Sequence, residues 1–138
     1  MPATSEMVLA KCTAIAAAED PNYRQSLRCG RHEMLADERP VRGGTDAGPM
    51  PFEYLLAGLS ACTSITLRMY AERKQWPLRA LHVDVRFRLE GKEGAIARVL
   101  SFEGELDDEQ RARLADVAER TPVTLTLKQG LPITTTLR

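Results

Sequence analysis

The stretch that decides the fold is PFEYLLAGLSACTSITLRMYAERK, residues 51–74. After Pro51 it contains no proline, and Gly58 is its only glycine. We therefore expect one long helix from Phe52 to about Lys74, with Pro51 in the first turn, where proline is tolerated. The first four turns are apolar or small on every face, which is typical of a helix that is buried all round.

The residues before this helix are predicted to form strands. Tyr23–Cys29 and His32–Asp37 flank Gly30-Arg31, a two-residue link typical of a type II′ hairpin turn. Met7–Ala17 is predicted to be a further strand. The segment 38–50 is rich in Gly and Pro, and we expect a loop there.

The residues after the helix are predicted to alternate again between strand and helix. Alternating apolar residues predict strands, and acidic residues at 107–109 open a second helix that Pro122 ends. The predicted strands are Leu81–Glu90, Ala97–Leu106, Val123–Leu127 and Ile133–Leu137. This order predicts an α+β fold, a single domain over residues 1–138, in which antiparallel sheet wraps a buried central helix.

Composition excludes several classes of protein. The 138 residues carry 19 Lys and Arg against 19 Asp and Glu, so the chain lacks the basic excess of a nucleic-acid-binding protein. No apolar run is long enough to span a membrane, and no basic segment precedes the apolar residues 7–18, so we expect no signal peptide and no membrane partner. Three cysteines without a CxxC motif favour a reduced, cytoplasmic chain.

Cys62 lies in the middle of the predicted long helix, and two interpretations of it are open. A free cysteine at a buried position is commonly an inert packing residue. A reactive thiol needs a nearby cation or a helix N-terminus to lower its pKa. Cys62 is eleven residues after Pro51, too far for the helix dipole to act, so an Arg from another segment would have to do so.

The sequence around Cys62 resembles a known family. GGTDAGPMPFEYLLAGLSACTSITLRMYA, residues 43–71, is similar to the central motif of the OsmC/Ohr family. GRHEMLADE at 30–38 and RKQWPL at 73–78 fit the same family. TPVTLTL at 121–127 stands where the family usually has Cys-Pro-Val-His. The resemblance covers nearly the whole chain.

The resemblance implies an intertwined homodimer that reduces organic hydroperoxides in oxidative stress, a peroxiredoxin-like activity. In such proteins the helix cysteine, here Cys62, attacks the peroxide as a thiolate and becomes a sulfenic acid. A second cysteine then forms a disulfide, and a dithiol reductant reopens it. An Arg and a Glu assist the first cysteine.

This chain departs from the family pattern at two positions. Thr121 occupies the place of the second cysteine, so an external thiol would have to resolve the sulfenic acid. The assisting acid would be Glu53, nine residues before Cys62 and not ten. Nine residues at about 100° each place the two side chains on opposite sides of a straight helix. The alternative is that Glu53 is an acid favoured in the first helical turn.

No arginine can be matched to the assisting position. Arg24, Arg31 and Arg42 precede the helix, and for each a solvated surface role is the alternative. Cys29 and His32 would face each other across the predicted hairpin, but the further metal ligands that zinc requires are missing. We therefore expect no metal and no cofactor.

Three functions are compatible with these residues. The first is a thiol peroxidase that acts on a small hydroperoxide through Cys62. The second is a dimer on the same scaffold that binds a small hydrophobic ligand without turnover. The third is a purely structural dimer. Reactivity of the Cys62 thiol distinguishes the first from the second, because a peroxidase needs an ionised thiol near neutral pH.

Overall fold

A computed structural model describes residues 6–138 as an α+β fold in which the strands form antiparallel sheets. The chain divides into two units, one that ends at Tyr54 and one that covers Leu55–Arg138. The α+β class and the antiparallel sheets predicted from the sequence are confirmed.

The first unit contains a three-stranded sheet in the order β1-β2-β3, formed by Cys12–Ile15, Gln25–Cys29 and His32–Ala36. Cys29 pairs with His32, which leaves Gly30 and Arg31 as the turn. Gly30 has φ +60°, a conformation that favours glycine, while Arg31 keeps a negative φ. The predicted hairpin is therefore confirmed, but β1 is much shorter than the expected strand Met7–Ala17.

A buried carboxylate organises the loop between β3 and the long helix. Asp37 accepts hydrogen bonds from the Thr45 hydroxyl and from the backbone N–H groups of Glu38, Thr45 and Ala47. These bonds, the Thr45 hydroxyl first, lower the pKa of Asp37 from 3.8 to about 2. The loop includes a short 3-10 helix, η1, over Pro40–Arg42.

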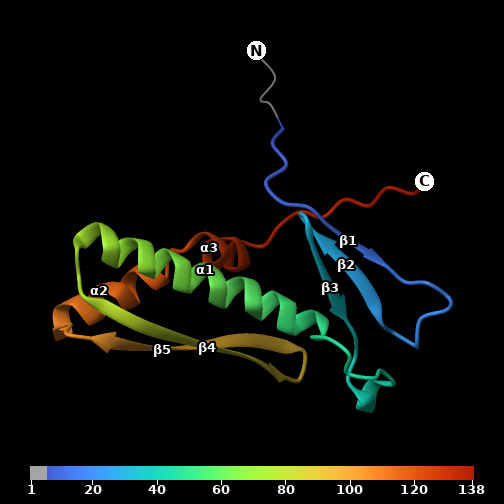
Figure 1. Ribbon diagram of the computed structural model, residues 1–138, viewed down its shortest axis with the longest axis horizontal. Coiled ribbons are helices and arrows are strands. Elements are labelled where there is room, and N and C mark those ends of the chain that lie inside the picture. Colours follow the sequence, from blue (N-terminus) through green and yellow to red (C-terminus); the bar gives the residue numbers. More distant parts are fainter. Residues whose placement is uncertain (1–5) are drawn as a thin grey trace. The chain divides into compact units, whose positions relative to one another are not determined.

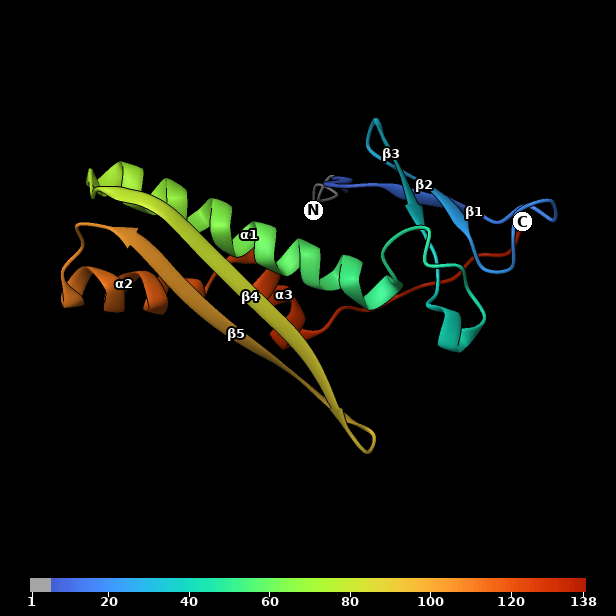
Figure 2. The ribbon, with the colours of Figure 1, turned by 60° about the horizontal axis from the view of Figure 1, so that its bottom comes forward.

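The second unit is a long hairpin covered by helices. β4 (Leu78–Glu90) pairs with β5 (Glu93–Gly104). The part of α1 (Pro51–Lys74) that belongs to this unit, from Leu55 onward, lies with α2 (Asp108–Ala118) and α3 (Pro122–Gln129) on one face of this hairpin (Figures 1 and 2). The alternating pattern of residues 81–90 is realised, because Leu81, Val83, Val85 and Phe87 are half-buried between exposed polar neighbours. A capping box between Asp107 and Gln110 begins α2.

The core of the second unit lies between α1, α2 and the open end of the hairpin. Its buried residues are Leu67, Ala71, Leu78, Leu106, Leu114 and Ala118. Leu67 and Leu114 are fully buried, and burial of each such side chain stabilises the fold by about 1.5–3 kcal/mol.

The expectation that the long helix is buried all round is wrong for the single chain. α1 buries the stripe Leu59, Thr63, Leu67 and Ala71, whose i, i+4 spacing keeps them on one face. On other faces of α1, Ile65 and Met69 are 54% and 58% exposed. The hairpin, α2 and α3 cover one side of α1, so its remaining apolar surface is open in one copy of the chain.

The expectation of two final strands is also wrong. Residues 122–129 form α3 where a strand Val123–Leu127 was predicted, and residues 130–138, which include the predicted strand Ile133–Leu137, have no regular secondary structure. Alternating Thr, Val and Leu residues favour a strand. Pro122 at the first helical position and the buried Thr124 instead favour a helix that packs its polar side inward.

Candidate functional site

Cys62 lies in the middle of α1 and is half-buried. Its neighbour Thr63 faces the interior of the second unit, together with Leu59 and Leu67. Successive helical residues are rotated by about 100°, so Cys62 lies at the flank of this buried stripe. It is the free cysteine among the residues that the structure describes.

The other two cysteines are joined to each other. Cys12 on β1 and Cys29 on β2 form a disulfide, which corrects the expectation of a fully reduced chain. The two residues are direct partners in the antiparallel register, with Cα atoms 4.1 Å apart, so their side chains meet across the strands. This pairing was not predicted, because the strand register was not known from the sequence.

Glu53 makes the contacts of a helix-capping acid. Its Oε1 accepts the backbone N–H of Met50 at 3.0 Å, and its Oε2 lies 3.8 Å from Nη2 of Arg39. A Glu at the third helical position that binds the N–H before the helix satisfies a donor that the helix itself leaves unpaired. These contacts favour the first-turn interpretation of Glu53. α1 is uninterrupted from Pro51 to Lys74, so Glu53 and Cys62, nine residues apart, lie on opposite sides of the helix.

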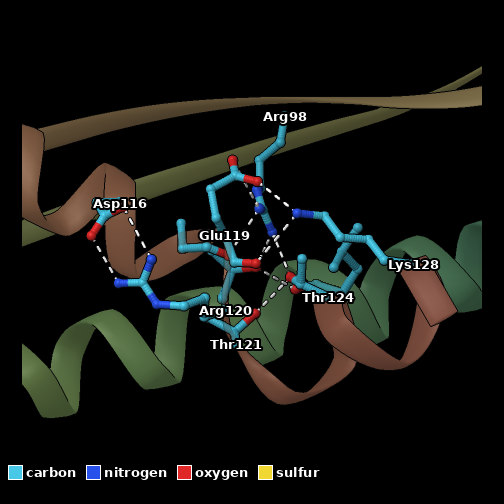
Figure 3. Close-up of polar contacts among 10 residues, drawn as sticks. Arg98, Asp116, Glu119, Arg120, Thr121, Thr124 and Lys128 are labelled. Atoms are coloured by element: carbon cyan, nitrogen blue, oxygen red, sulfur yellow. Dashed lines mark hydrogen bonds and ion pairs between the residues drawn. The ribbon is translucent and has the colours of Figure 1, made fainter.

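Thr121, at the position of the second cysteine of the family pattern, is fully buried at the start of α3. Its hydroxyl lies 2.6 Å from the hydroxyl of Thr124 (Figure 3). Nη1 of Arg98 donates to Thr124 at 2.9 Å and to Thr63 at 3.0 Å. The Thr63 hydroxyl in turn donates to the carbonyl of Leu59. We call Arg98, Thr63, Thr121 and Thr124 the threonine–arginine network.

Arg98 holds three helices against the hairpin. It projects from β5, and its side chain is only 12% exposed. Besides Thr63 on α1 and Thr124 on α3, it donates from Nη2 to the carbonyl of Ala118 at the end of α2, at 2.9 Å. A carbonyl at a helix C-terminus carries partial negative charge, which a guanidinium stabilises.

Sequence reasoning missed Arg98. The signal that could have revealed it is its place in β5, where Arg98, Leu100 and Phe102 alternate on the half-buried face. A charged residue on the inward face of a strand needs partners inside the fold.

Further charged residues surround this network. Glu119 lies 3.8 Å from Nη2 of Arg98 and accepts Nζ of Lys128 at 2.9 Å. Lys128, first, and Arg98 lower the pKa of Glu119, so it is ionised at neutral pH. The next residue, Arg120, makes two hydrogen bonds to Asp116 (Figure 3).

The second unit also contains a hollow of about 650 Å³ beside the network, which we call the hairpin cavity. Its apolar wall includes Leu59, Phe87, Ile96, Leu100, Ala115 and Leu127. Its polar wall includes Arg98, Glu119, Thr124 and Lys128. Sites for small molecules usually have volumes of roughly 300–1,000 Å³ and such a mixed lining.

The arginines considered from the sequence belong to the first unit. Arg24 donates to the Thr45 hydroxyl at 3.2 Å, while its Nε is buried without a hydrogen-bond partner among the described residues. Arg42 lies 3.7 Å from Glu38 and is largely exposed. Arg31 is exposed in the turn between β2 and β3.

Metal binding by Cys29 and His32 is not supported. The two residues are cross-strand partners, as expected, but the sulfur of Cys29 is bonded to Cys12. Over residues 6–138, no group of three or more His, Cys, Asp or Glu is arranged to hold a metal ion.

A hairpin layered on a long helix that carries one free thiol defines an α+β thiol protein. The sequence model of the family described as OsmC-like protein matches residues 44–136, and the chain belongs to this family. No curated protein matches the chain by sequence.

Solved structures with similar folds include proteins of this family. An OsmC-like protein from Mycoplasma pneumoniae has a TM-score of 0.73 at 20% identity, with 86% of each chain covered. An organic hydroperoxide resistance protein OsmC from Legionella pneumophila has a TM-score of 0.67 at 15% identity, with 90% of this chain and 92% of that one covered. The organic hydroperoxide resistance protein OhrB of Bacillus subtilis has a TM-score of 0.59 at 19% identity, with 86% and 90% covered. At these identities the likeness concerns the fold.

Within the part of the chain that the structure describes, none of the helices is both long and apolar enough to cross a membrane.

Proposed function

We propose that this protein reduces organic hydroperoxides through Cys62. The observation that carries the proposal is the state of the three cysteines: Cys12 and Cys29 are paired, and Cys62 on the central helix is free. The hydroperoxide resistance named for relatives of the same fold supports the substrate class.

The reaction begins with attack of the Cys62 thiolate on the outer peroxide oxygen. The O–O bond breaks, the alcohol leaves with a proton, and Cys62 becomes a sulfenic acid. Thr121 has no thiol with which to condense. An external thiol therefore attacks the sulfenic acid and releases water, and a second thiol frees Cys62 as a disulfide of the two reductant molecules leaves.

The test is intact-mass spectrometry after one equivalent of cumene hydroperoxide, without reductant. We expect the gain of one oxygen per chain, and conversion to a mixed disulfide when a small thiol is added. Cys62→Ser should abolish both products. The double variant Cys12→Ser/Cys29→Ser is the matched control, because it leaves Cys62 as the one thiol of the chain, and it should still gain one oxygen.

Two results would contradict the proposal. A peptide that links Cys62 to Cys12 or Cys29 would show that the chain resolves its own sulfenic acid. An unchanged mass would favour the alternative, a dimer that binds a small apolar ligand without turnover.

We also propose that the protein is a homodimer in which a second copy covers the open face of α1. Ile65 and Met69 are largely exposed there, and a Cβ built at Gly58 would meet no atom of the same chain within 4 Å. An uncovered apolar helix face is unfavourable in water, and small residues allow another backbone to approach closely. Light scattering at micromolar concentration should give twice 15.3 kDa, and Ile65→Glu should give a monomer. A wild-type mass of one chain would refute this assembly.

A further inference from the structure

The wall of the hairpin cavity carries a net positive charge. Its wall holds the cations Arg98 and Lys128 and the single carboxylate Glu119, which leaves an excess of one positive charge. Much of the remaining lining is apolar, and the Arg98 side chain is only 12% exposed, so the charge of Arg98 is screened less by water than that of Lys128 or Glu119. A ligand that matches this wall is apolar over most of its length and carries one negative charge.

Arg98 has hydrogen-bonding capacity left over. A guanidinium has five N–H donors, and three of them bind Thr63, Thr124 and the carbonyl of Ala118. The carboxylate of Glu119, at 3.8 Å, is beyond hydrogen-bond distance. Two donors, on Nε and Nη2, thus have no acceptor among the described residues. N–H donors of a guanidinium make strong, charge-assisted hydrogen bonds to carboxylate oxygens.

We propose that the hairpin cavity binds a small carboxylate with an unbranched apolar chain. The carboxylate accepts a hydrogen bond from the unused N–H donors of Arg98 and is attracted by Lys128. The chain lies against Phe87, Ile96 and Leu127. This site is formed by residues of the second unit, and Cys62 is not part of its wall.

Calorimetric titration with decanoate and with decylammonium tests the proposal, because the two probes share a chain length and differ in charge. We expect saturable binding of one decanoate per chain, about tenfold or more tighter than any binding of decylammonium, since the wall attracts anions and repels cations. Lys128→Met should weaken decanoate binding a few-fold. Lys128 is more than half exposed, so this variant should fold normally.

A matched pair of variants on β5 locates the site. Ile96 lines the cavity, whereas Val99 is 60% exposed and is not part of the lining. Ile96→Trp should fill the cavity and abolish binding, and Val99→Trp should leave it unchanged. The far-ultraviolet circular dichroism of both variants should match that of the wild type.

Three results would overturn the proposal: no decanoate binding, equal binding of decylammonium, or binding that survives in Ile96→Trp. If Ile96→Trp did not fold, unchanged decanoate affinity in Lys128→Met would be sufficient to reject it. Decanoate has no peroxide bond, so failure of this binding leaves the proposed chemistry of Cys62 untouched.

Discussion

Replacement of Arg98 by Met should strongly destabilise the second unit. The change keeps most of the side-chain volume but removes the hydrogen bonds to Thr63, Thr124 and the carbonyl of Ala118. A hydrogen bond to a charged group contributes about 1.5–3 kcal/mol, and loss of one partner leaves the other unpaired. The desolvation of a buried cation, which the variant avoids, offsets part of this loss. We expect the free energy of unfolding to fall by about 3–5 kcal/mol, the range observed when one partner of a buried charged pair is removed.

Urea unfolding followed by circular dichroism, at one fixed protein concentration, measures this loss. Arg86→Met is the matched control, because Arg86 lies on the same hairpin and is 67% exposed beside Asp84. An exposed ion pair contributes only about 0–1 kcal/mol. A double-mutant cycle with Thr124→Val should show a coupling energy of about 1 kcal/mol or more with Arg98. If Arg98→Met cost no more than Arg86→Met, the structural role given to Arg98 would be refuted.

Asp37→Asn should reduce the loss of stability in acid. Because the pKa of Asp37 is lowered to about 2, its ionised carboxylate stabilises the fold fully above pH 3.8, and this stabilisation is lost as the pH falls toward about 2. The urea midpoint should therefore fall less between about pH 5 and pH 2 in this variant than in the wild type. Gly44→Ala should cost roughly 1–3 kcal/mol in the same assay, because its Cβ would overlap the carbonyl of Glu38, and an unchanged midpoint would contradict this packing. Cys12→Ser should lower stability by up to about 3 kcal/mol, since the disulfide closes a loop of 17 residues. The same variant should speed amide exchange in β1, whereas Cys62→Ser should leave that exchange as it is.

Much of the fold was predictable from local patterns. The long helix was predicted to within one residue, because an uninterrupted apolar run after a proline has few other solutions. The turn at Gly30 and the β4–β5 hairpin followed from turn chemistry and from alternation. Residues 122–129 show where this reasoning fails: their alternation favours a strand, but packing of Thr124 against Arg98 selects a helix.

The candidate site was predictable only in part. Cys62 follows from the family motif, and the structure describes it as a free, half-buried cysteine. Arg98 lies 36 residues further along the chain, and its contacts depend on how helices meet the hairpin, which periodicity does not encode. The Cys12–Cys29 disulfide depends on strand register in the same way. The catalytic roles of Cys62 and Glu53 and the single domain over 1–138 stay predictions.

The contact between Thr121 and Thr124 has an evolutionary consequence. The two oxygens lie 2.6 Å apart and Thr121 is fully buried, while a sulfur atom is larger than oxygen and a weaker hydrogen-bonding group. Thr121→Cys would therefore crowd Thr124 and weaken its support for Arg98 before any disulfide chemistry was gained. A lineage with this network reaches a two-cysteine protein only through a less stable intermediate or through a paired change at position 124. The threonine–arginine network thus disfavours a cysteine at position 121 and keeps Cys62 as the one free thiol of the chain.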